Sequence, residues 1–306
     1  MIRKVLITVA IVMGVLSILI AGGTAVLYLT NGGDFRVPAT TLDDRSLPYI
    51  ELEGYRFHGE VHGAIDSPVV IVLHGGPGGD YRSLLPLTAL EDDYRIVFYD
   101  QRGSGLSPRV PDEELTLDRY IADVDLFVER FSPDSRVRII GHSWGAMLAS
   151  AYIGRHQDKV AAAVLAEPGF LDEEHRQVFE EMTGLSDLEP SPRVIAALAA
   201  YYPDDDLENA VGDSWRFGAA ASAAIPGSGI DKNGRLIDLA AGVETWSGKA
   251  LFVSGSENSI IGPDYQAEQM SRFPHAQLSV VEGAGHTMIG EKPTESLAII
   301  RRFLAD

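Results

Sequence analysis

The chain has 306 residues, of which 45% are hydrophobic, and it carries 44 aspartate and glutamate residues against 25 lysine and arginine residues. This length accommodates one large α/β domain with a modest insertion. The net charge of −19 and the lack of a basic cluster beyond the first four residues argue against nucleic acid or anionic lipid headgroups as partners. The absence of cysteine excludes disulfides and an N-terminal lipoprotein attachment.

The N-terminal segment differs from the rest of the chain. Arg3 and Lys4 precede an uncharged, largely apolar run from Val5 to Leu29, which would span about 37 Å as a helix at ~1.5 Å per residue. A bilayer core is about 30 Å thick, whereas a secretory signal has an apolar core of only about 7 to 15 residues. We therefore predict a transmembrane signal-anchor over 1–29, with the N-terminus in the cytoplasm and the following domain outside. The alternative is cleavage near residues 21–23 and a secreted protein.

The remaining chain divides into a linker and a domain. Residues 30–48 are polar, contain glycine and proline and lack periodicity, so they are predicted to be a linker. Over 49–306, strand-like runs alternate with amphipathic helical runs such as Thr116 to Phe131, which predicts a mostly parallel central sheet flanked by helices. The predicted strands are Tyr49 to Val61, Val69 to Leu73, Arg95 to Tyr99, Arg136 to Ile140, Val160 to Ala166, Ala250 to Ser254 and Gln277 to Val281.

A glycine-rich loop, HGGPGG at 74–79, directly follows the predicted strand VVIVL. Such a loop can bring a backbone N–H close to a substrate carbonyl, and Gly76 is the best-placed donor. A phosphate-binding interpretation fails because the loop has neither G-x-G-x-x-G spacing nor a lysine. His74, at the end of the strand, is predicted to brace the loop rather than to catalyse.

A second motif, GHSWG at 141–145, lies between a β-branched run and a helix-favouring run. This pattern is typical of a nucleophile elbow, in which glycines allow a tight strand-to-helix turn that exposes the serine. Ser143 is therefore the predicted nucleophile. The backbone N–H of Trp144, at the start of the helix, is predicted to be the second oxyanion donor beside that of Gly76. The alternative is a glycine-rich turn with an incidental serine.

Between Gly169 and Trp246 no strand-like run occurs, and short helical runs are separated by prolines. This interval predicts a helical cap insertion, residues 170–246, after the sixth strand. Its part from Leu171 to Asp213 is the most acidic stretch of the chain, with Arg176 and Arg193 as its two basic residues.

The general base of an elbow serine is expected after the last strand, because the partners follow the order serine, acid, histidine. His286 alone among the histidines meets this test, since it lies between the predicted strand QLSVV and the final predicted helix, Lys292 to Leu304.

HGGPGG, DQRGSGLS at 100–107 and GHSWG together resemble the α/β-hydrolase superfamily, and specifically the proline iminopeptidase group of serine hydrolases. The resemblance covers about Tyr49 to Asp306. It implies an α/β-hydrolase fold, a nucleophilic Ser143 with His286 as base, and bracing roles for Asp100 and Arg102. It implies no metal or organic cofactor.

The triad acid departs from this family. Asn258 stands where the family carries aspartate, and an amide cannot stabilise the imidazolium formed on His286. Either Glu257, one position earlier, supplies the carboxylate, or Glu167 does so from the end of the sixth strand, as in some haloalkane dehalogenases of this fold. Glu167 is favoured because a charge at the end of an apolar strand needs a buried partner. The alternative is a glutamate that merely caps the insertion.

These features predict a membrane-anchored serine hydrolase that acts on a small molecule or short peptide through an acyl-enzyme. An aminopeptidase of proline iminopeptidase type is the first expectation, with the acidic insertion facing a substrate ammonium group. The alternatives are a carboxylesterase and a non-catalytic binding protein that retains the fold. Haloalkane dehalogenase and epoxide hydrolase chemistries are disfavoured, because both use aspartate as nucleophile.

Overall fold

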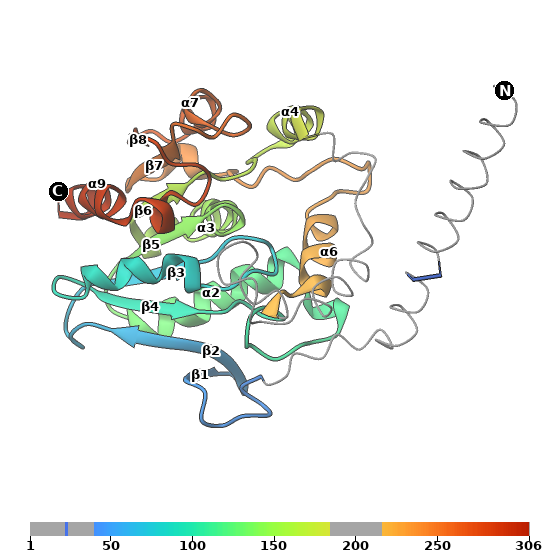
Figure 1. Cartoon of the computed structure of the whole chain (residues 1–306), viewed down its shortest axis with the longest axis vertical. Helices are drawn as coiled ribbons and strands as arrows, with labels where there is room; N and C mark the ends of the chain where they lie inside the picture. Colours follow the sequence, from blue (N-terminus) through green and yellow to red (C-terminus); the bar gives the residue numbers. More distant parts are fainter. Residues whose placement is uncertain (1–21, 24–39, 184–215, 306) are drawn as a thin grey trace, which may run out of the picture. The chain divides into compact units, whose positions relative to one another are not determined.

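The computed structural model describes residues 22–23, 40–183 and 216–305. Its centre is an eight-stranded sheet of order β1-β2-β4-β3-β5-β6-β7-β8 (Figure 1). The strands from β3 to β8 pair in parallel, whereas β2 is antiparallel to both β1 and β4. The strands are β1 Tyr49–Leu52, β2 Tyr55–His62, β3 Val69–Leu73, β4 Arg95–Tyr99, β5 Val137–His142, β6 Val160–Ala166, β7 Lys249–Gly255 and β8 Ala276–Val281. The predicted mostly parallel α/β sheet is confirmed.

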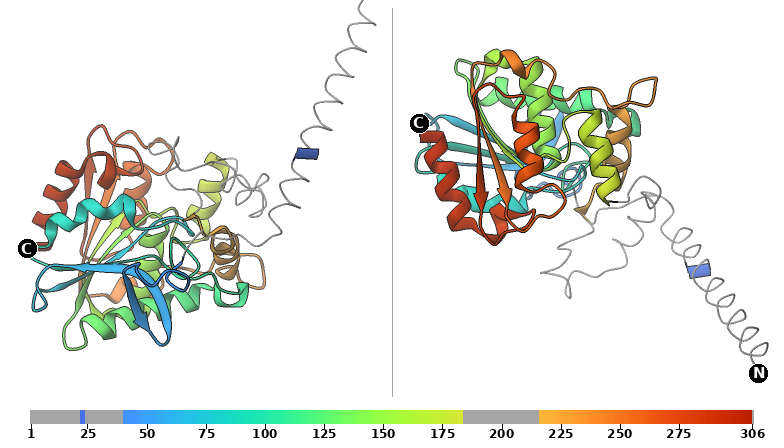
Figure 2. Two further views of the ribbon diagram at one scale, coloured as in Figure 1. Left: turned by 60° about the horizontal axis from the view of Figure 1, so that its bottom comes forward. Right: turned by 90° about the horizontal axis from the view of Figure 1, so that it is seen from above.

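Helices cover both faces of this sheet (Figure 2). Successive residues of β3 show the division, because Val69, Ile71 and Leu73 belong to one buried cluster and Val70 and Val72 to the other. The α-helices of the sheet layers are α2 Leu117–Phe131, α3 Trp144–Arg155, α7 Pro263–Met270, α8 Met288–Glu291 and α9 Pro293–Ala305, and short 3₁₀ segments include η1 Arg82–Leu90, η2 Asp112–Glu114, η3 Gln157–Lys159 and η7 Val243–Thr245.

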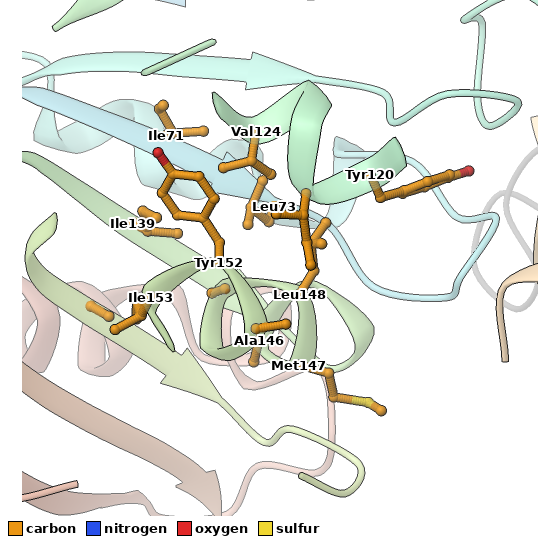
Figure 3. Packing of buried hydrophobic residues seen from close by; sticks show 14 of the residues in the cluster. Ile71, Leu73, Tyr120, Val124, Ile139, Ala146, Met147, Leu148, Tyr152 and Ile153 are labelled. Carbon is orange, nitrogen blue, oxygen red and sulfur yellow. The ribbon is translucent and has the colours of Figure 1, made fainter. Parts of the chain in front are cut away.

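Helix α3 is buried along most of its length. Ala146, Leu148 and Ile153 pack with residues of β3, β5 and α2 in one cluster (Figure 3). Burial of this apolar surface holds the start of the helix in a fixed position. It therefore also fixes the carboxyl end of β5, which the helix follows. Helix α2 begins after Thr116, whose hydroxyl accepts a hydrogen bond from the Arg119 N–H as an N-cap.

Two boundaries differ from expectation. The run Tyr49 to Val61 forms two strands joined by a turn, because Glu53 and Gly54 adopt φ values of 47° and 80°. The second half of the predicted linker is packed on the domain. Thr41 is fully buried, with its N–H donating to Leu106 O and its hydroxyl to Arg56 O. The packed part of the chain therefore includes Thr41, before Tyr49, because backbone carbonyls that are distant in sequence accept both hydrogen bonds of this threonine.

In its described part, the insertion after β6 contains α4 Glu173–Thr183 and α6 Ala219–Ser228. Within residues 216–248, which precede β7, the only β-type pairing is an isolated bridge between Ile230 and Leu236. These residues agree with the predicted helical character of the cap.

The predicted transmembrane run, Val5 to Leu29, lies outside the described residues except for 22–23. Within the described ranges, no helix combines the length and apolar character needed to cross a membrane. The anchor and the bilayer contact stay predictions.

Because β3, β5, β6, β7 and β8 are parallel, their carboxyl ends meet at one edge of the sheet. The loops that follow these strands carry all of the predicted catalytic residues, which are Gly76, Ser143, Trp144, Glu167 and His286. Ligands of open parallel sheets bind at this edge.

Candidate active site

Ser143 occupies a strained turn between β5 and α3. Its φ of 53° and ψ of −120° lie outside the regions that side chains favour, at a cost of about 1–3 kcal/mol. The turn requires both flanking glycines, because a Cβ on Gly141 would lie 2.4 Å from Gly145 O and a Cβ on Gly145 would lie 2.0 Å from Leu73 O. The sequence motif therefore forms the geometry of a nucleophile elbow.

Two backbone N–H groups adjoin this serine. Trp144 is the first residue of α3, and the first N–H groups of a helix have no partner within it. On the opposite loop, Gly76 has a φ of 128°, and its N–H donates to no group of the described residues. Gly76, Ser143 and Trp144 line the same cavity, so both N–H groups belong to residues that share a cavity with Ser143.

The structure brings His286 and Glu167 into direct contact. His286 Nδ1 lies 2.7 Å from Glu167 Oε2. Since the carboxylate accepts, Nδ1 carries the proton and Nε2 keeps the lone pair that a general base needs. Glu167 is fully buried at the end of β6, where its φ is 45°. This buried carboxylate therefore fixes the orientation of the His286 imidazole.

Every oxygen of the Glu167 carboxylate has hydrogen-bond donors. Oε1 accepts from the Ser254 hydroxyl at 2.7 Å and from the Gly255 N–H at 2.8 Å. Oε2 accepts from Asn258 Nδ2 at 2.7 Å in addition to His286. A buried carboxylate is tolerated when its lone pairs are satisfied in this way.

Asn258 has a role that sequence reasoning missed. Its amide donates to Glu167, while its Oδ1 accepts from the N–H groups of Ile260 and Ile261. The residue that replaces the family aspartate thus supports the carboxylate on β6. The sequence held one signal for this role, namely a glutamate after the sixth strand together with an asparagine at the usual position of the acid. Glu257, the alternative acid, is exposed and its N–H donates to Ala284 O.

Ser143 and His286 line one cavity of about 680 Å³ together with Asn258. The described residues show no hydrogen bond between Ser143 and His286. In unliganded enzymes the hydrogen bond between nucleophile and base is often long, and it shortens when the substrate binds. Most of the other lining side chains are apolar, and they come from the elbow, from α2, from the cap and from the loop after β7: Leu117, Met147, Phe170, Phe179, Ile225, Pro226, Ile230, Leu236, Leu239, Ile260 and Ile261.

The charged groups of the cavity wall are paired with one another. Arg176 of α4 donates Nε and Nη2 to Glu173 at 2.8 Å each and Nη1 to Glu180. This pairing lowers the pKa of Glu173 to about 2, because the guanidinium and the Leu236 N–H both stabilise the carboxylate. Arg176 and Glu180 line the cavity, so its charged lining within the described residues is neutral in sum.

The predicted bracing residues lie behind the two loops. Asp100 is buried and accepts from His58 Nδ1, the Tyr81 N–H and the Leu106 N–H. Arg102 donates two hydrogen bonds to buried Asp123, at 2.9 and 2.8 Å. Neither lines the cavity, which agrees with a structural role.

No group of three or more His, Asp or Glu side chains suited to a metal ion occurs within 40–183 and 216–305. The described side chains of the site include a hydroxyl (Ser143), an imidazole (His286) and a buried carboxylate (Glu167).

Burial of His142 makes the stability of the fold depend on pH. Burial, and secondarily the neighbouring His286, lower its pKa from 6.5 to about 4. Between these pH values the unfolded chain binds a proton that the folded chain does not, so the free energy of unfolding falls as the pH falls, by up to about 3 kcal/mol. We expect His142→Gln to flatten this dependence in denaturant unfolding between pH 7 and pH 4. The same change at exposed His275 is the control, and equal slopes in wild type and His142→Gln would contradict the account.

Comparison with known proteins identifies the family of the chain. Residues 68–293 match the family model of the alpha/beta hydrolase fold. The chain is 26% identical to the esterase YbfF of Escherichia coli over 253 residues, which are 79% of this chain and 94% of that protein. It is 42% identical to a proline iminopeptidase of Heyndrickxia coagulans over 100 residues, which are 32% of this chain and only about a third of that protein, 34%.

Solved structures share the architecture. A proline iminopeptidase-related protein from Thermus thermophilus superimposes with a TM-score of 0.63 at 23% identity, over 85% of this chain and 96% of that one. The proline iminopeptidase of Mycobacterium smegmatis gives a TM-score of 0.59 at 18% identity, over 84% and 97% of the two chains. These likenesses support the fold, while the family match and the sequence relatives support the class of enzyme. The chain belongs to the α/β-hydrolase family, is similar to proline iminopeptidases, and is a hydrolase.

Proposed function

We propose that this hydrolase acts through a covalent acyl-enzyme on Ser143, with His286 as general base and Glu167 as the triad acid. The observation that carries the proposal is the 2.7 Å contact between His286 Nδ1 and the buried Glu167 carboxylate, beside a serine held in a strained turn. A buried carboxylate in this position fixes the tautomer of the base and stabilises the imidazolium that forms during the reaction.

The reaction follows from these positions. Ser143 Oγ attacks the substrate carbonyl carbon while its proton passes to His286 Nε2. The carbonyl oxygen becomes an oxyanion that accepts from the N–H groups of Gly76 and Trp144. The imidazolium then protonates the leaving group, which departs and leaves an acyl-serine. A water molecule, deprotonated by His286, attacks the acyl-serine, and the bond to Ser143 Oγ then breaks as His286 returns the proton to this oxygen, which releases the acid.

For the substrate, we propose a neutral ester with a bulky apolar group. Among the described residues the cavity wall is predominantly apolar, and the Arg176 and Glu180 side chains that line it carry opposite charges and form an ion pair. An ammonium group entering this wall would have to compete with Arg176 for the carboxylate, and burial of an unpaired charge is costly. A relative that matches over most of the chain, YbfF, is also an esterase.

An iminopeptidase-type aminopeptidase is the second candidate. The observation in its favour is the 42% identity to a proline iminopeptidase around the shared motifs. The presence of the Glu180 carboxylate in the cavity lining also fits an amine-bearing substrate.

Substrates that share the same leaving group separate the two candidate functions. When all of them are anilides, the higher intrinsic reactivity of esters over amides does not affect the comparison. We expect prolyl 4-nitroanilide to be a poorer substrate than N-acetylprolyl 4-nitroanilide and hexanoyl 4-nitroanilide, by about 100-fold in kcat/KM. The reason is that only the first carries an ammonium group. Faster hydrolysis of the unblocked compound would contradict the preference for a neutral substrate and favour the aminopeptidase.

A pair of charge variants tests the role of Arg176, with Arg272→Met as the matched control for Arg176→Met. Arg176→Met leaves Glu173 and Glu180 without their cation, so it should raise the relative rate on the unblocked anilide. Arg272 also pairs with carboxylates, those of Asp172, Asp238 and Glu244, but it does not line the cavity. Arg272→Met should therefore leave the preference unchanged.

A further inference from the structure

Gln101 connects the two loops that carry the proposed oxyanion donors. Its side chain is 1% exposed and does not line the cavity. Gln101 Oε1 accepts from the indole Nε1–H of Trp144 at 2.9 Å, and Gln101 Nε2 donates to His74 O at 2.9 Å. One amide therefore spans from the elbow to the loop after β3.

The backbone of Gln101 completes the connection. Its N–H donates to His74 Nε2 at 2.9 Å. Because Nε2 accepts this bond, the proton lies on Nδ1, which donates to Gly75 O at 2.8 Å. His74 is thereby held at its carbonyl and at both ring nitrogens. Gly75, whose carbonyl receives the last of these bonds, directly precedes Gly76.

Gln101 itself is held on both sides. Asp100 is fixed by three donors, and Arg102 is fixed by buried Asp123. The amide therefore projects from an anchored segment, and neither of its ends can move without loss of a buried hydrogen bond. Such a group can set the separation of two loops to within a few tenths of an ångström.

We propose that Gln101 is a positioning residue that sets the distance between the Gly76 and Trp144 N–H groups, and so tunes the oxyanion hole. This proposal rests on the proposed function. It assigns to the glutamine a role in transition-state stabilisation that acts through Trp144 and His74, without contact with the substrate. Its loss should therefore lower kcat and leave KM nearly unchanged.

The test uses three single variants of the full chain and one double variant, which combines Gln101→Met with Trp144→Phe. Gln101→Met keeps the side-chain volume and removes both amide contacts. Trp144→Phe removes the indole donor and keeps the backbone N–H. Trp246→Phe is the matched control. The Trp246 indole, like that of Trp144, is buried and donates a hydrogen bond, but its acceptor is Val160 O at the start of β6, the end opposite to Glu167.

The readouts are kcat, KM and the inhibition constant of an alkylboronic acid, whose tetrahedral adduct on serine places an oxygen in the oxyanion hole. We expect Gln101→Met to lower kcat and boronate affinity by about 10- to 100-fold, somewhat less than removal of a whole donor. Trp144→Phe should act in the same direction, and the double variant should be no worse than the poorer single variant, because both break one connection. Trp246→Phe should lower only the thermal unfolding midpoint.

The outcomes separate this proposal from the function on which it rests. A wild-type enzyme that neither hydrolyses esters nor binds the boronate contradicts the proposed function. An active wild-type enzyme in which Gln101→Met loses stability like Trp246→Phe, but keeps kcat and boronate affinity, contradicts the positioning role alone. Additive losses in the double variant contradict the connection between Gln101 and Trp144.

Discussion

Replacement of Ser143 by alanine is expected to lower kcat by about six orders of magnitude, because the acyl-enzyme cannot form without the hydroxyl. Alanine removes a single oxygen and keeps the turn, so the fold should persist. Hydrolysis of 4-nitrophenyl hexanoate measures the loss, and circular dichroism checks the fold.

Ser150 provides the matched control for this substitution. It lies in α3, the helix that follows Ser143, is fully buried, and donates its hydroxyl to Ala146 O. Ser150→Ala should keep the rate near that of the wild type. Turnover by Ser143→Ala at a rate close to that of Ser150→Ala would show that another residue is the nucleophile.

Glu167→Gln is expected to lower kcat by about 10⁴, because the amide can hold His286 in the wrong tautomer and cannot stabilise its imidazolium. The four hydrogen bonds to the carboxylate indicate that the variant also loses stability, so thermal unfolding is measured beside the rate. Exposed Glu257 gives the control, and Glu257→Gln should be silent. The reverse result would place the acid in the loop after β7.

A second substitution tests whether the carboxylate itself matters. Asn258 Nδ2 lies 2.7 Å from the Glu167 oxygen that contacts His286, so an aspartate at 258 stands one contact away from the imidazole. Glu167→Gln with Asn258→Asp should recover about tenfold or more over Glu167→Gln alone. Asn258→Asp by itself should reduce activity, because it sets two carboxylates against each other. No recovery in the double variant, together with full activity of Asn258→Asp, would contradict the role of Glu167.

The sequence predicted the elements whose causes are local. Glycines at 141 and 145 point to a tight turn because no side chain fits there, and the structure places both against backbone carbonyls. Continuous β-branched runs indicated the buried parallel strands. The hairpin turn at Glu53 and Gly54 carried a weaker signal, a single glycine inside a strand-like run, and was missed.

Features that depend on distant residues could not be predicted in this way. Thr41 is packed because Arg56 O and Leu106 O meet it in the folded chain. Asn258 supports Glu167 across 91 positions of sequence, a relation that only the sheet edge creates. The pairing of Arg176 with Glu173 and Glu180 is different, because spacings of three and four residues on a helix made it readable from the sequence.

The most direct test of a serine nucleophile activated by His286 and Glu167 is the site of covalent labelling by a fluorophosphonate. Trypsin releases residues 139–155, IIGHSWGAMLASAYIGR, which contain Ser143 and Ser150. Fragmentation of this peptide by mass spectrometry distinguishes the two. The account predicts one adduct per chain, on Ser143, formed far more slowly in Glu167→Gln. An unlabelled wild-type chain, an adduct on another residue, or equal labelling rates in wild type and Glu167→Gln would contradict it.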